Sequence, residues 1–465
     1  MEARSLKQIA ELCGGEFVRG AAETPVARVC TDSRLLQTGD LFFAIKGENF
    51  DGHTFLTEAA AKGAAGVVAE RAAIPAELSG CGIVAVENSR QALGRLAAGY
   101  RASFNLPVIA VAGSNGKTST KELIAAALRK KLRTVWSEAS FNNDIGVPLT
   151  LLKIERQHEV AVLEAGTNHP GELRALIELM RPGLGVITCI GREHLEFFDD
   201  LAGVAEEEGV LAELLPPSGT LYLNGDDEWS ETLVRRCRSQ VVRVGFGDRN
   251  QWRAHGLRMD KAGVSFRVAA PIAAYSGEYR INLLGRHQVG NALFAVALGA
   301  GLGVGREEIE QGLAECQPAK MRLQVWELGG VRVLDDAYNA NADSMMMALR
   351  TLQEFPCKGR KVAVLGDMAE LGRHSEAAHE EVGRHAAQLG IDQLFALGKM
   401  APVVARGARQ GGLHRVLEFA DVEAAAQALK SFLKTGDCLL LKASRATRLE
   451  RITEHLRGFD AGRRN

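Results

Sequence analysis

One short segment, Gly113-Ser-Asn-Gly-Lys-Thr-Ser119, constrains the fold of this 465-residue chain more than any other. It follows the apolar run 106–112, which is typical of a strand buried on both faces of a parallel sheet. It precedes an amphipathic pattern that predicts a helix over 119–133. A glycine-rich turn between such elements lets successive backbone N–H groups and the helix N-terminus face a phosphate. The segment therefore predicts a nucleotide phosphate site within an α/β domain.

This loop departs from the usual phosphate-loop pattern. GxxxxGK[ST] would place a glycine at position 111, where the chain has Val111, so the loop has the shortened form GxxGK[ST]. Lys117 supplies positive charge and Thr118 offers a hydroxyl to a metal ion. The alternative is a glycine-rich turn that merely starts a helix, and the flanking strand and helix disfavour it. We expect the nucleotide to contact Gly113, Ser114, Asn115, Gly116, Lys117, Thr118 and Ser119.

Length and periodicity predict three α/β domains. At about 150 residues per domain the chain has room for three cores, and short apolar runs alternate with helical patterns along it. We expect a small α/β N-terminal domain over 1–103, a central phosphate-loop domain with a mostly parallel sheet over 104–318, and a Rossmann-like C-terminal domain over 319–465. Gly329 and Gly330, between two strand-like runs, predict a hairpin near the start of the third domain.

Charge and hydropathy exclude several classes of protein. The chain has 56 Lys and Arg against 57 Asp and Glu, whereas affinity for a nucleic-acid backbone needs a basic surplus. The longest weakly polar stretch, 292–304, is shorter than the roughly 20 residues of a membrane-spanning helix. The first residues lack an apolar signal core, and the eight cysteines are scattered without a CxxC pair. We expect a cytosolic monomer that binds no nucleic acid and does not span a membrane.

Two later strand-like runs end in polar residues, at the position where open parallel sheets bind ligands. The run 160–163 leads to Glu164, and the run 186–190 leads to His194. Together with Thr118 they predict a cation beside the phosphates, either magnesium or, because a histidine ligand is unusual for magnesium, manganese. Singly, Glu164 could be a surface carboxylate and His194 a helix-capping residue. Their joint occurrence after a phosphate loop favours the metal site.

These features together resemble a known family, the ATP-dependent Mur ligases of peptidoglycan synthesis. The resemblance rests on GSNGKTS, on Asn142-Asn-Asp-Ile-Gly-Val-Pro148, and on the strand ends at Glu164 and His194, and it spans essentially the whole chain. The segments 336–345 and 366–372 are similar to those of the member that joins D-alanyl-D-alanine to UDP-N-acetylmuramoyl-tripeptide. The DNPR segment expected of the preceding ligase is absent. The resemblance implies an ATP- and magnesium-dependent amide ligase that works through an acyl phosphate.

The resemblance also implies roles for residues outside the loop. An N-terminal domain would hold the uridine nucleotide through Asp32-Ser-Arg34 and 39–53, and a C-terminal domain would bind D-alanyl-D-alanine and close on ATP. Implied nucleotide contacts are His287, Asn291, Arg322, Asp336, Tyr338 and Asn339. Implied substrate contacts are Ser33, Arg34, Asn142, Asn143, Asn341, Lys442, Ser444 and Arg445. Ala342 and Ala443 replace a proline and a glycine of the family's YNANP and KGSR segments, from which we expect altered loop stiffness rather than altered chemistry.

The run Glu206-Glu-Glu208 lies on a helix predicted over 202–215, and such a run is usually a solvated helix face. Several Mur ligases carry a lysine after the metal histidine, and its carbamylation makes a carboxylate for a second magnesium. The matching position here is Glu208. Our hypothesis is that Glu208 supplies that charge directly, so that activity is independent of bicarbonate. The implied catalytic set is then Lys117, Glu164, His194 and Glu208.

Three other functions remain open. A folylpolyglutamate synthase shares the shortened loop and the acyl phosphate, but has no reason to carry the segment YNANADSM or a uridine-nucleotide domain. A switch or scaffold that binds nucleotide without ligation would release phosphate independently of D-alanyl-D-alanine. A dinucleotide-dependent dehydrogenase is disfavoured, because Lys117 stands where that fingerprint needs a close backbone approach to pyrophosphate. The sequence also leaves open whether the acceptor tripeptide ends in lysine or diaminopimelate.

Overall fold

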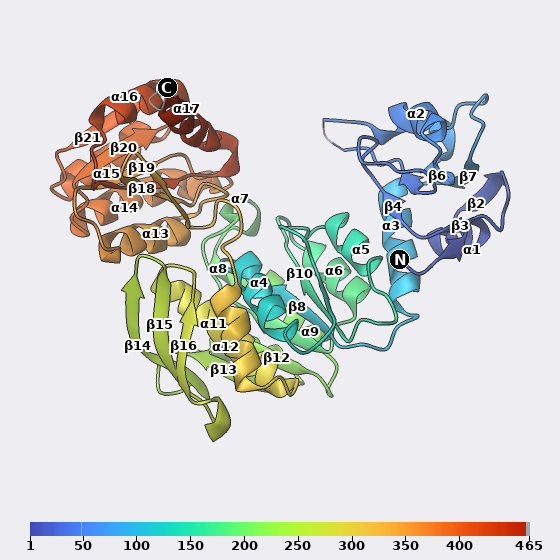
Figure 1. The fold of residues 1–465 in the computed structure, drawn as a ribbon, viewed down its shortest axis with the longest axis horizontal. Coiled ribbons are helices and arrows are strands. Elements are labelled where there is room, and N and C mark those ends of the chain that lie inside the picture. The colour runs from blue at the N-terminus through green and yellow to red at the C-terminus, as the bar shows by residue number, and fades with distance from the viewer. Residues whose placement is uncertain (48, 462–465) are drawn as a thin grey trace. The chain divides into compact units, whose positions relative to one another are not determined.

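The computed structural model describes residues 1–47 and 49–461 (Figure 1). Residue 48, inside the stretch 39–53, and residues 462–465, inside the range predicted for the C-terminal domain, lie outside the described residues. The chain packs into two compact units. One contains Met1–Ala110, Leu132–Thr167 and Leu173–Leu184, and the other contains Val111–Lys131, Asn168–Glu172 and the described residues from Gly185 onward. The domain boundaries after residues 103 and 318 stay a prediction.

The first unit begins with a five-stranded sheet. Its strand order is β2 (Glu16–Arg19), β7 (Gly82–Val86), β6 (Gly66–Glu70), β5 (Leu41–Phe43) and β4 (Val29–Cys30). β4 to β7 run parallel, and β2 pairs antiparallel with β7 at one edge. The remaining elements of this region are β1 (Arg4–Ser5), α1 (Leu6–Cys13), β3 (Pro25–Val26), η1 (Gly52–Phe55), α2 (Leu56–Ala61), η2 (Arg71–Ala73) and α3 (Ser89–Arg101). Phe42, Leu56 and Val67 belong to its fully buried core.

A nine-stranded sheet carries the phosphate loop. Its order is β16 (Gly277–Ile281), β15 (Gly263–Ala269), β14 (Trp252–Asp260), β13 (Gln240–Gly245), β12 (Thr220–Asn224), β11 (Leu184–Ile187), β8 (Val108–Ala112), β10 (Val160–Glu164) and β9 (Thr134–Trp136). The pairs β9–β10, β12–β13 and β13–β14 are parallel, whereas β14, β15 and β16 form an antiparallel extension. The continuous apolar runs therefore form buried strands, as their sequence predicts.

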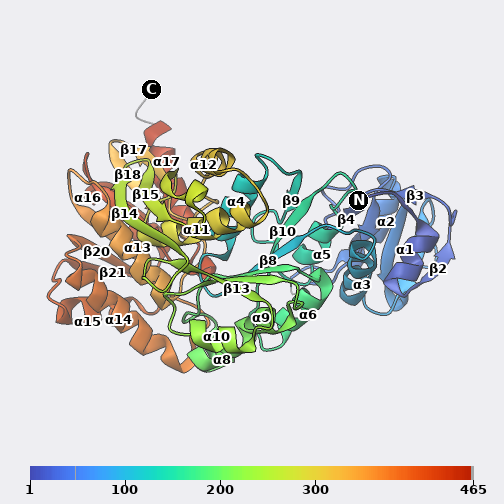
Figure 2. The ribbon, with the colours of Figure 1, turned by 90° about the horizontal axis from the view of Figure 1, so that it is seen from below.

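Helices cover both faces of the part of this sheet that belongs to the second unit. Figure 2 shows α4, α11 and α12 on one face and α8, α9 and α10 on the other. The helices of the sheet region are α4 (Lys117–Leu128), α5 (Gly146–Leu151), α6 (Glu172–Met180), α7 (Leu195–Phe198), α8 (Leu201–Glu208), α9 (Val210–Leu214), α10 (Ser230–Arg236), η3 (Ala273–Tyr275), α11 (Arg286–Gly301) and α12 (Arg306–Glu315). α4 packs against α11 and α12, so the helix that follows the phosphate loop is held on two sides.

Two predicted helices differ from the observed ones. The helix predicted over 119–133 begins two residues earlier, at Lys117, because Gly116 serves as its N-cap, and it ends five residues earlier, at Leu128. The helix predicted over 202–215 is divided at Gly209, where a Cβ would lie 2.2 Å from Nη1 of Arg236. That guanidinium donates to the carbonyl oxygen of Glu206 at 2.7 Å, and so supplies a hydrogen-bond donor to the C-terminal end of α8.

The C-terminal region of the second unit is a separate parallel sheet between helices. Its order is β17 (Gln324–Leu328), β18 (Val331–Asp335), β22 (Cys438–Lys442), β19 (Lys361–Leu365), β20 (Gln393–Leu397) and β21 (Val416–Phe419), with only the β17–β18 hairpin antiparallel. Its helices are α13 (Ala342–Glu354), η4 (Gly372–His374), α14 (Ser375–Gln388), α15 (Ala401–Gln410), α16 (Val422–Phe432), η5 (Arg445–Thr447) and α17 (Glu450–Ala461). Figure 1 shows α13 and α14 on one side of the sheet and α16 and α17 on the other.

The predicted fold class is confirmed. The described chain is α/β with mostly parallel sheets, and the hairpin predicted at Gly329 and Gly330 joins β17 to β18, with both glycines at positive φ. Over residues 1–47 and 49–461 no helix has the length and apolar character needed to cross a membrane.

Candidate active site

At two positions of the phosphate loop, the backbone has a conformation that favours glycine. Gly113 has φ 109° and Gly116 has φ 85°, both in the left-handed region that side chains disfavour. A Cβ on Gly113 would lie 2.4 Å from Oγ1 of Thr188, and one on Gly116 would lie 2.7 Å from Oδ1 of Asn291. Both the conformation and the space around the loop therefore require these glycines, and the loop leads directly into α4.

Lys117 folds back over the loop that it terminates. Its Nζ donates to the carbonyl oxygens of Gly113 at 2.6 Å and Ser114 at 3.2 Å, and it pairs with Oε1 of Glu193 at 3.2 Å. Burial raises the pKa of Glu193 above its usual value, while the ammonium of Lys117 acts in the opposite direction. Sequence reasoning missed Glu193, although it lies beside His194 at the end of the same strand-like run.

Glu208 lies at the same loop. Its Oε2 accepts a hydrogen bond from the backbone N–H of Gly113 at 2.7 Å. Burial raises its pKa to about 7, against the attraction of Lys117, and the charge of Glu193 adds to the rise. Of the acidic run only Glu206 is exposed, so the run is more than a solvated helix face. The structure therefore places Glu208 next to the predicted phosphate site, and its catalytic role stays a prediction.

Glu164 is a buried carboxylate rather than a surface one. It ends β10 in the first unit with 1% of its surface exposed, and its Oε1 accepts from Nδ2 of Asn142 at 2.9 Å. Two of the predicted residues thus lie in contact. Asn143 instead accepts from the backbone N–H groups of Ile145 and Gly146 at 3.2 and 2.9 Å, which fixes the start of α5. Its predicted contact with substrate stays untested.

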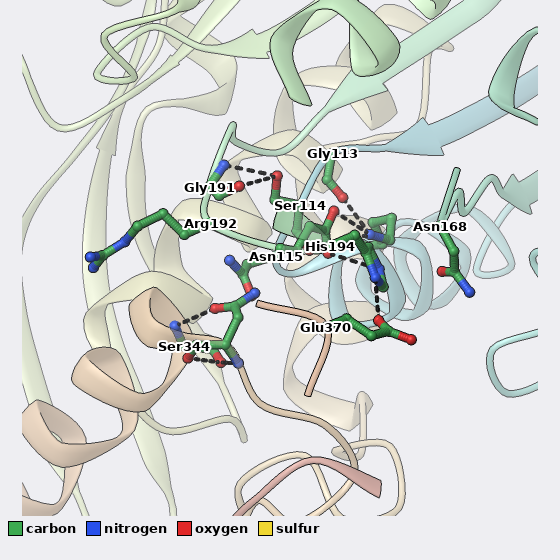
Figure 3. A network of polar contacts seen from close by, with 12 residues as sticks. Gly113, Ser114, Asn115, Asn168, Gly191, Arg192, His194, Ser344 and Glu370 are labelled. Carbon is green, nitrogen blue, oxygen red and sulfur yellow. Dashed lines mark hydrogen bonds and ion pairs between the residues drawn. The ribbon is translucent and has the colours of Figure 1, made fainter. Parts of the chain in front are cut away.

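His194 has the partner that a metal-binding histidine needs. It occupies the N-cap position of α7 with φ 51°, but its side chain makes no capping hydrogen bond. Its Nδ1 lies 2.5 Å from Oε2 of Glu370 (Figure 3). Its Nε2 lies 3.9 Å from Oε2 of Glu193. In the neutral tautomer with its proton on Nδ1, the ring donates to Glu370 and Nε2 has a lone pair for a cation. Glu370 lies in the segment 366–372, whose sequence carries part of the family resemblance, but that sequence does not predict its contact with His194.

The remaining residues of the phosphate loop make contacts that shape the site. Ser114 Oγ accepts from the backbone N–H of Gly191 at 2.8 Å, which joins the loop to the residues after β11. Asn115 Oδ1 accepts from Nδ2 of Asn341 at 3.0 Å (Figure 3). Thr118 and Ser119 lie buried in the first turn of α4. Among the described residues, His, Cys, Asp and Glu side chains form no group of three or more that could hold a metal ion, and the predicted set also relies on a hydroxyl.

Several of the implied C-terminal contacts come together. Lys442 Nζ lies 2.5 Å from Oδ2 of Asp336 and 3.1 Å from the carbonyl of Asn339, and burial lowers its pKa. Burial also lowers the pKa of His287 to about 4, with the charges of Asp336 and Lys442 acting on it. Arg322 lies over the ring of Tyr338, 4.3 Å from its centroid. These residues form a second polar cluster in the second unit.

The other predicted residues contact neighbouring residues of the protein or lie elsewhere in the fold. Ser444 Oγ donates to the carbonyl of Ala340 at 3.1 Å, and Arg445 pairs with Glu450 at 3.1 Å. Asn291 lies on α11 beside Gly116. Ser33 and Arg34 belong to the first unit, where Arg34 pairs with Asp32 at 2.7 Å. The nucleotide and substrate contacts of all these residues stay predictions.

Three family models match successive parts of the chain. They are described as Mur ligase family, catalytic domain, over residues 25–101, Mur ligase middle domain over 111–299, and Mur ligase, glutamate ligase domain, over 321–445. Two curated relatives named UDP-N-acetylmuramoyl-tripeptide--D-alanyl-D-alanine ligase are each 35% identical to the chain. The one from Bacillus subtilis (strain 168) covers 98% of the chain and 99% of its own length, and the one from Escherichia coli (strain K12) covers 97% and 98%.

Solved structures agree with these matches. A crystal structure of MurF from Acinetobacter baumannii aligns with a TM-score of 0.89 at 31% identity and covers 98% of this chain and 99% of its own. MurF ligase from Thermotoga maritima in complex with ADP aligns with a TM-score of 0.81 at 27% identity, over 94% and 99%. A folylpolyglutamate synthase from Mycobacterium tuberculosis, at 16% identity and a TM-score of 0.62 over 79% of this chain and 94% of its own, shares the fold alone. With curated relatives 35% identical over nearly its whole length, the chain belongs to the Mur ligase family.

Proposed function

We propose that the chain joins D-alanyl-D-alanine to UDP-N-acetylmuramoyl-tripeptide in an ATP-dependent reaction that yields UDP-N-acetylmuramoyl-pentapeptide, ADP and phosphate. The observation that carries the proposal is the whole-length similarity, at 35% identity, to two ligases of that name. The loop that ends at Lys117 supports it, because it offers backbone N–H groups and an ammonium to a polyphosphate.

The reaction needs an activated carboxyl group, because joining a carboxylate to an amine in water is unfavourable. A carboxylate oxygen of the tripeptide attacks the γ-phosphorus, the bond to the β–γ bridging oxygen breaks, and ADP leaves. The amine of D-alanyl-D-alanine then attacks the carbonyl carbon of the acyl phosphate. The carbon–oxygen bond to phosphate breaks, inorganic phosphate leaves, and the nitrogen loses a proton.

Positive charge at the loop serves the first step. Two unit charges of like sign 4 Å apart repel by about 4 kcal/mol at an effective dielectric constant near 20, so an anionic carboxylate approaches ATP only against repulsion. Lys117 is held over the loop by two carbonyl oxygens, and the N-terminus of α4 adds a partial positive charge. Both groups act by electrostatics and positioning, in a site formed before the substrates react.

We propose that the reaction uses magnesium, with Thr118, Glu164 and His194 as its ligands. Two observations in the second unit support a cation near His194 and Lys117. The Nδ1 of His194 faces a carboxylate, as in many metal-binding histidines. Near Lys117, the buried carboxyl groups of Glu193 and Glu208 provide more acidic groups than one ammonium balances. When bound, magnesium or manganese would neutralise phosphate charge during phosphoryl transfer.

The C-terminal residues are proposed to serve the second substrate. Lys442, Ser444 and Arg445 would lie near the incoming dipeptide, and Asp336 and Asn339 hold the ammonium of Lys442 in place. We also propose that the C-terminal domain closes on the central one when ATP and tripeptide bind, which would shield the acyl phosphate from water. Small-angle scattering tests this: a radius of gyration unchanged by an ATP analogue with tripeptide would refute closure.

One assay tests the function. The protein is incubated with ATP, magnesium, D-alanyl-D-alanine and UDP-muramoyl-tripeptides ending in either lysine or diaminopimelate, and the products are read by mass. We expect one tripeptide to gain the mass of the dipeptide less one water, together with phosphate release that requires D-alanyl-D-alanine. Phosphate release that is independent of the dipeptide would instead support a nucleotide-binding protein without ligase activity.

A further inference from the structure

An arginine two residues before the predicted metal histidine links three parts of the second unit. Arg192 follows Gly191 in the loop after β11, and 26% of its side chain is exposed. Its Nε and Nη2 donate to Oδ1 of Asp343 at 2.9 and 2.7 Å, and its backbone N–H donates to Oδ2 of the same carboxylate at 2.7 Å. Its Nη1 donates to Oε2 of Glu381 at 2.5 Å. One residue therefore joins this loop to both α13 and α14.

The end of α13 that holds Arg192 also holds the phosphate loop. Asp343 lies in the first turn of the helix, where a carboxylate is favoured by the helix dipole. The N-cap residue Asn341 accepts from the backbone N–H of Ser344 and donates to Asn115 (Figure 3). The same helix N-terminus thus contacts the phosphate loop through Asn341 and the loop after β11 through Asp343.

The neighbours of Arg192 in the chain are the residues that reach the predicted reaction centre. Gly191 bonds Ser114, Glu193 pairs with Lys117, and His194 bonds Glu370. Consecutive Cα atoms are 3.8 Å apart, so a displacement of Arg192 is passed directly to Glu193 and His194. The contact of Arg192 with α13 and α14 is therefore in a position to control where these two side chains lie.

We propose that Arg192 is a positioning residue: Asp343 and Glu381 clamp its guanidinium, and the clamp sets the placement of Glu193 and His194 relative to Lys117. The inference rests on the proposed ligase function and deepens it. Arginine suits the task because its planar fork can bind one carboxylate through two nitrogens and still donate to a second, which the point charge of a lysine cannot do with the same geometry.

The test compares Arg192→Gln, Arg192→Lys, Glu381→Gln and the double variant Arg192→Gln/Glu381→Gln in steady-state ligation. We expect kcat to fall by about 10-fold in Arg192→Gln and by about 3-fold in Glu381→Gln, with intermediate rescue in Arg192→Lys and KM for the UDP-linked substrate within about 2-fold. The control is Arg253→Gln on β14, which breaks an ion pair with the exposed Asp248 and should leave kcat unchanged.

Two results would overturn the proposal. One is a kcat of Arg192→Gln equal to that of Arg253→Gln, and the other is a double variant whose loss is the product of the two single losses, since members of one clamp are not additive. Should Arg192→Gln not fold, Glu381→Gln decides alone, and an unchanged kcat there refutes the clamp. Glu381 suits this use because 42% of its side chain is exposed.

Hydrogen exchange separates this inference from the ligase function. Exchange of the peptide 190–196 should be several-fold faster in Arg192→Gln than in the wild type or in Arg253→Gln, whether or not any product forms. Equal exchange in all three proteins refutes the clamp. Wild-type protein that makes no pentapeptide product refutes the proposed function but leaves this comparison intact.

Discussion

Replacement of Glu208 by glutamine is expected to stabilise the protein while it impairs the reaction. The carboxyl group of Glu208 is buried at the phosphate loop, and its pKa of about 7 compares with a usual value of 4.5. At 1.36 kcal/mol per pKa unit, that difference corresponds to a penalty of about 3 kcal/mol on the ionised form in the folded protein. Glutamine keeps an oxygen that can accept from Gly113 and carries no charge to desolvate.

The sign of the pH effect follows from linkage. Between pH 4.5 and pH 7 the folded protein holds a proton on Glu208 that the unfolded chain has lost, so the free energy of unfolding decreases as pH rises through this window. The full penalty is present above pH 7 and absent below pH 4.5. Glu208→Gln should therefore exceed the wild type in stability by up to about 3 kcal/mol at pH 8, and match it near pH 4.5.

Scanning calorimetry at several pH values measures this difference. The melting transition that contains α4 should lie several degrees higher in Glu208→Gln than in the wild type at pH 8, and the gap should close toward pH 4.5. Glu206→Gln is the matched control, because Glu206 is on the same helix with 79% of its side chain exposed. A gap that is independent of pH, or one that Glu206→Gln reproduces, would refute the assignment of a costly buried charge to Glu208.

Three further predictions concern the same loop. Lys117→Ala should reduce ATP turnover by about 100-fold or more with an unchanged circular dichroism spectrum, and near-normal turnover would remove Lys117 from the mechanism. Gly116→Ala should weaken ADP binding in calorimetry and lower the free energy of unfolding by about 1–3 kcal/mol, because its Cβ would meet Asn291 at positive φ; wild-type affinity would contradict this. Rigorous removal of bicarbonate should leave ligase activity intact, since Glu208 is already a carboxyl group, and a loss that bicarbonate restores would reject that role.

The strands and the phosphate loop could be predicted from the sequence because their signals are local. The run 106–112 contains β8, and the run 160–163 lies within β10, since continuous apolar residues between turn signals leave little choice. Helix ends were less accurate. The break at Gly209 depends on Arg236, which lies 27 positions away in sequence and reaches the carbonyls of α8 only in the folded chain.

The least predictable part of the site is its set of acidic partners. Glu193 meets Lys117 across 76 positions of sequence, and Glu370 meets His194 across 176. No short pattern encodes such pairs, because the carboxyl ends of separate strands come together only when the sheets form. The burial of two of the three acidic residues is hidden from the sequence for the same reason. Glu207 and Glu208 bond backbone N–H groups of loops that lie far from α8 in the chain.

Two buried carboxyl groups near a single lysine are unfavourable for folding, and the proposed reaction gives a reason for their presence. Each of Glu193 and Glu208 has a raised pKa, so burial works against both, and Lys117 offsets only part of that effect. Hydrophobic side chains of similar volume would stabilise the fold but would remove the groups that can meet a cation beside ATP. Residues that weaken the fold where they serve the reaction are typical of functional sites, and the opposite signs expected for Glu208→Gln, higher stability and lower turnover, follow directly from that arrangement.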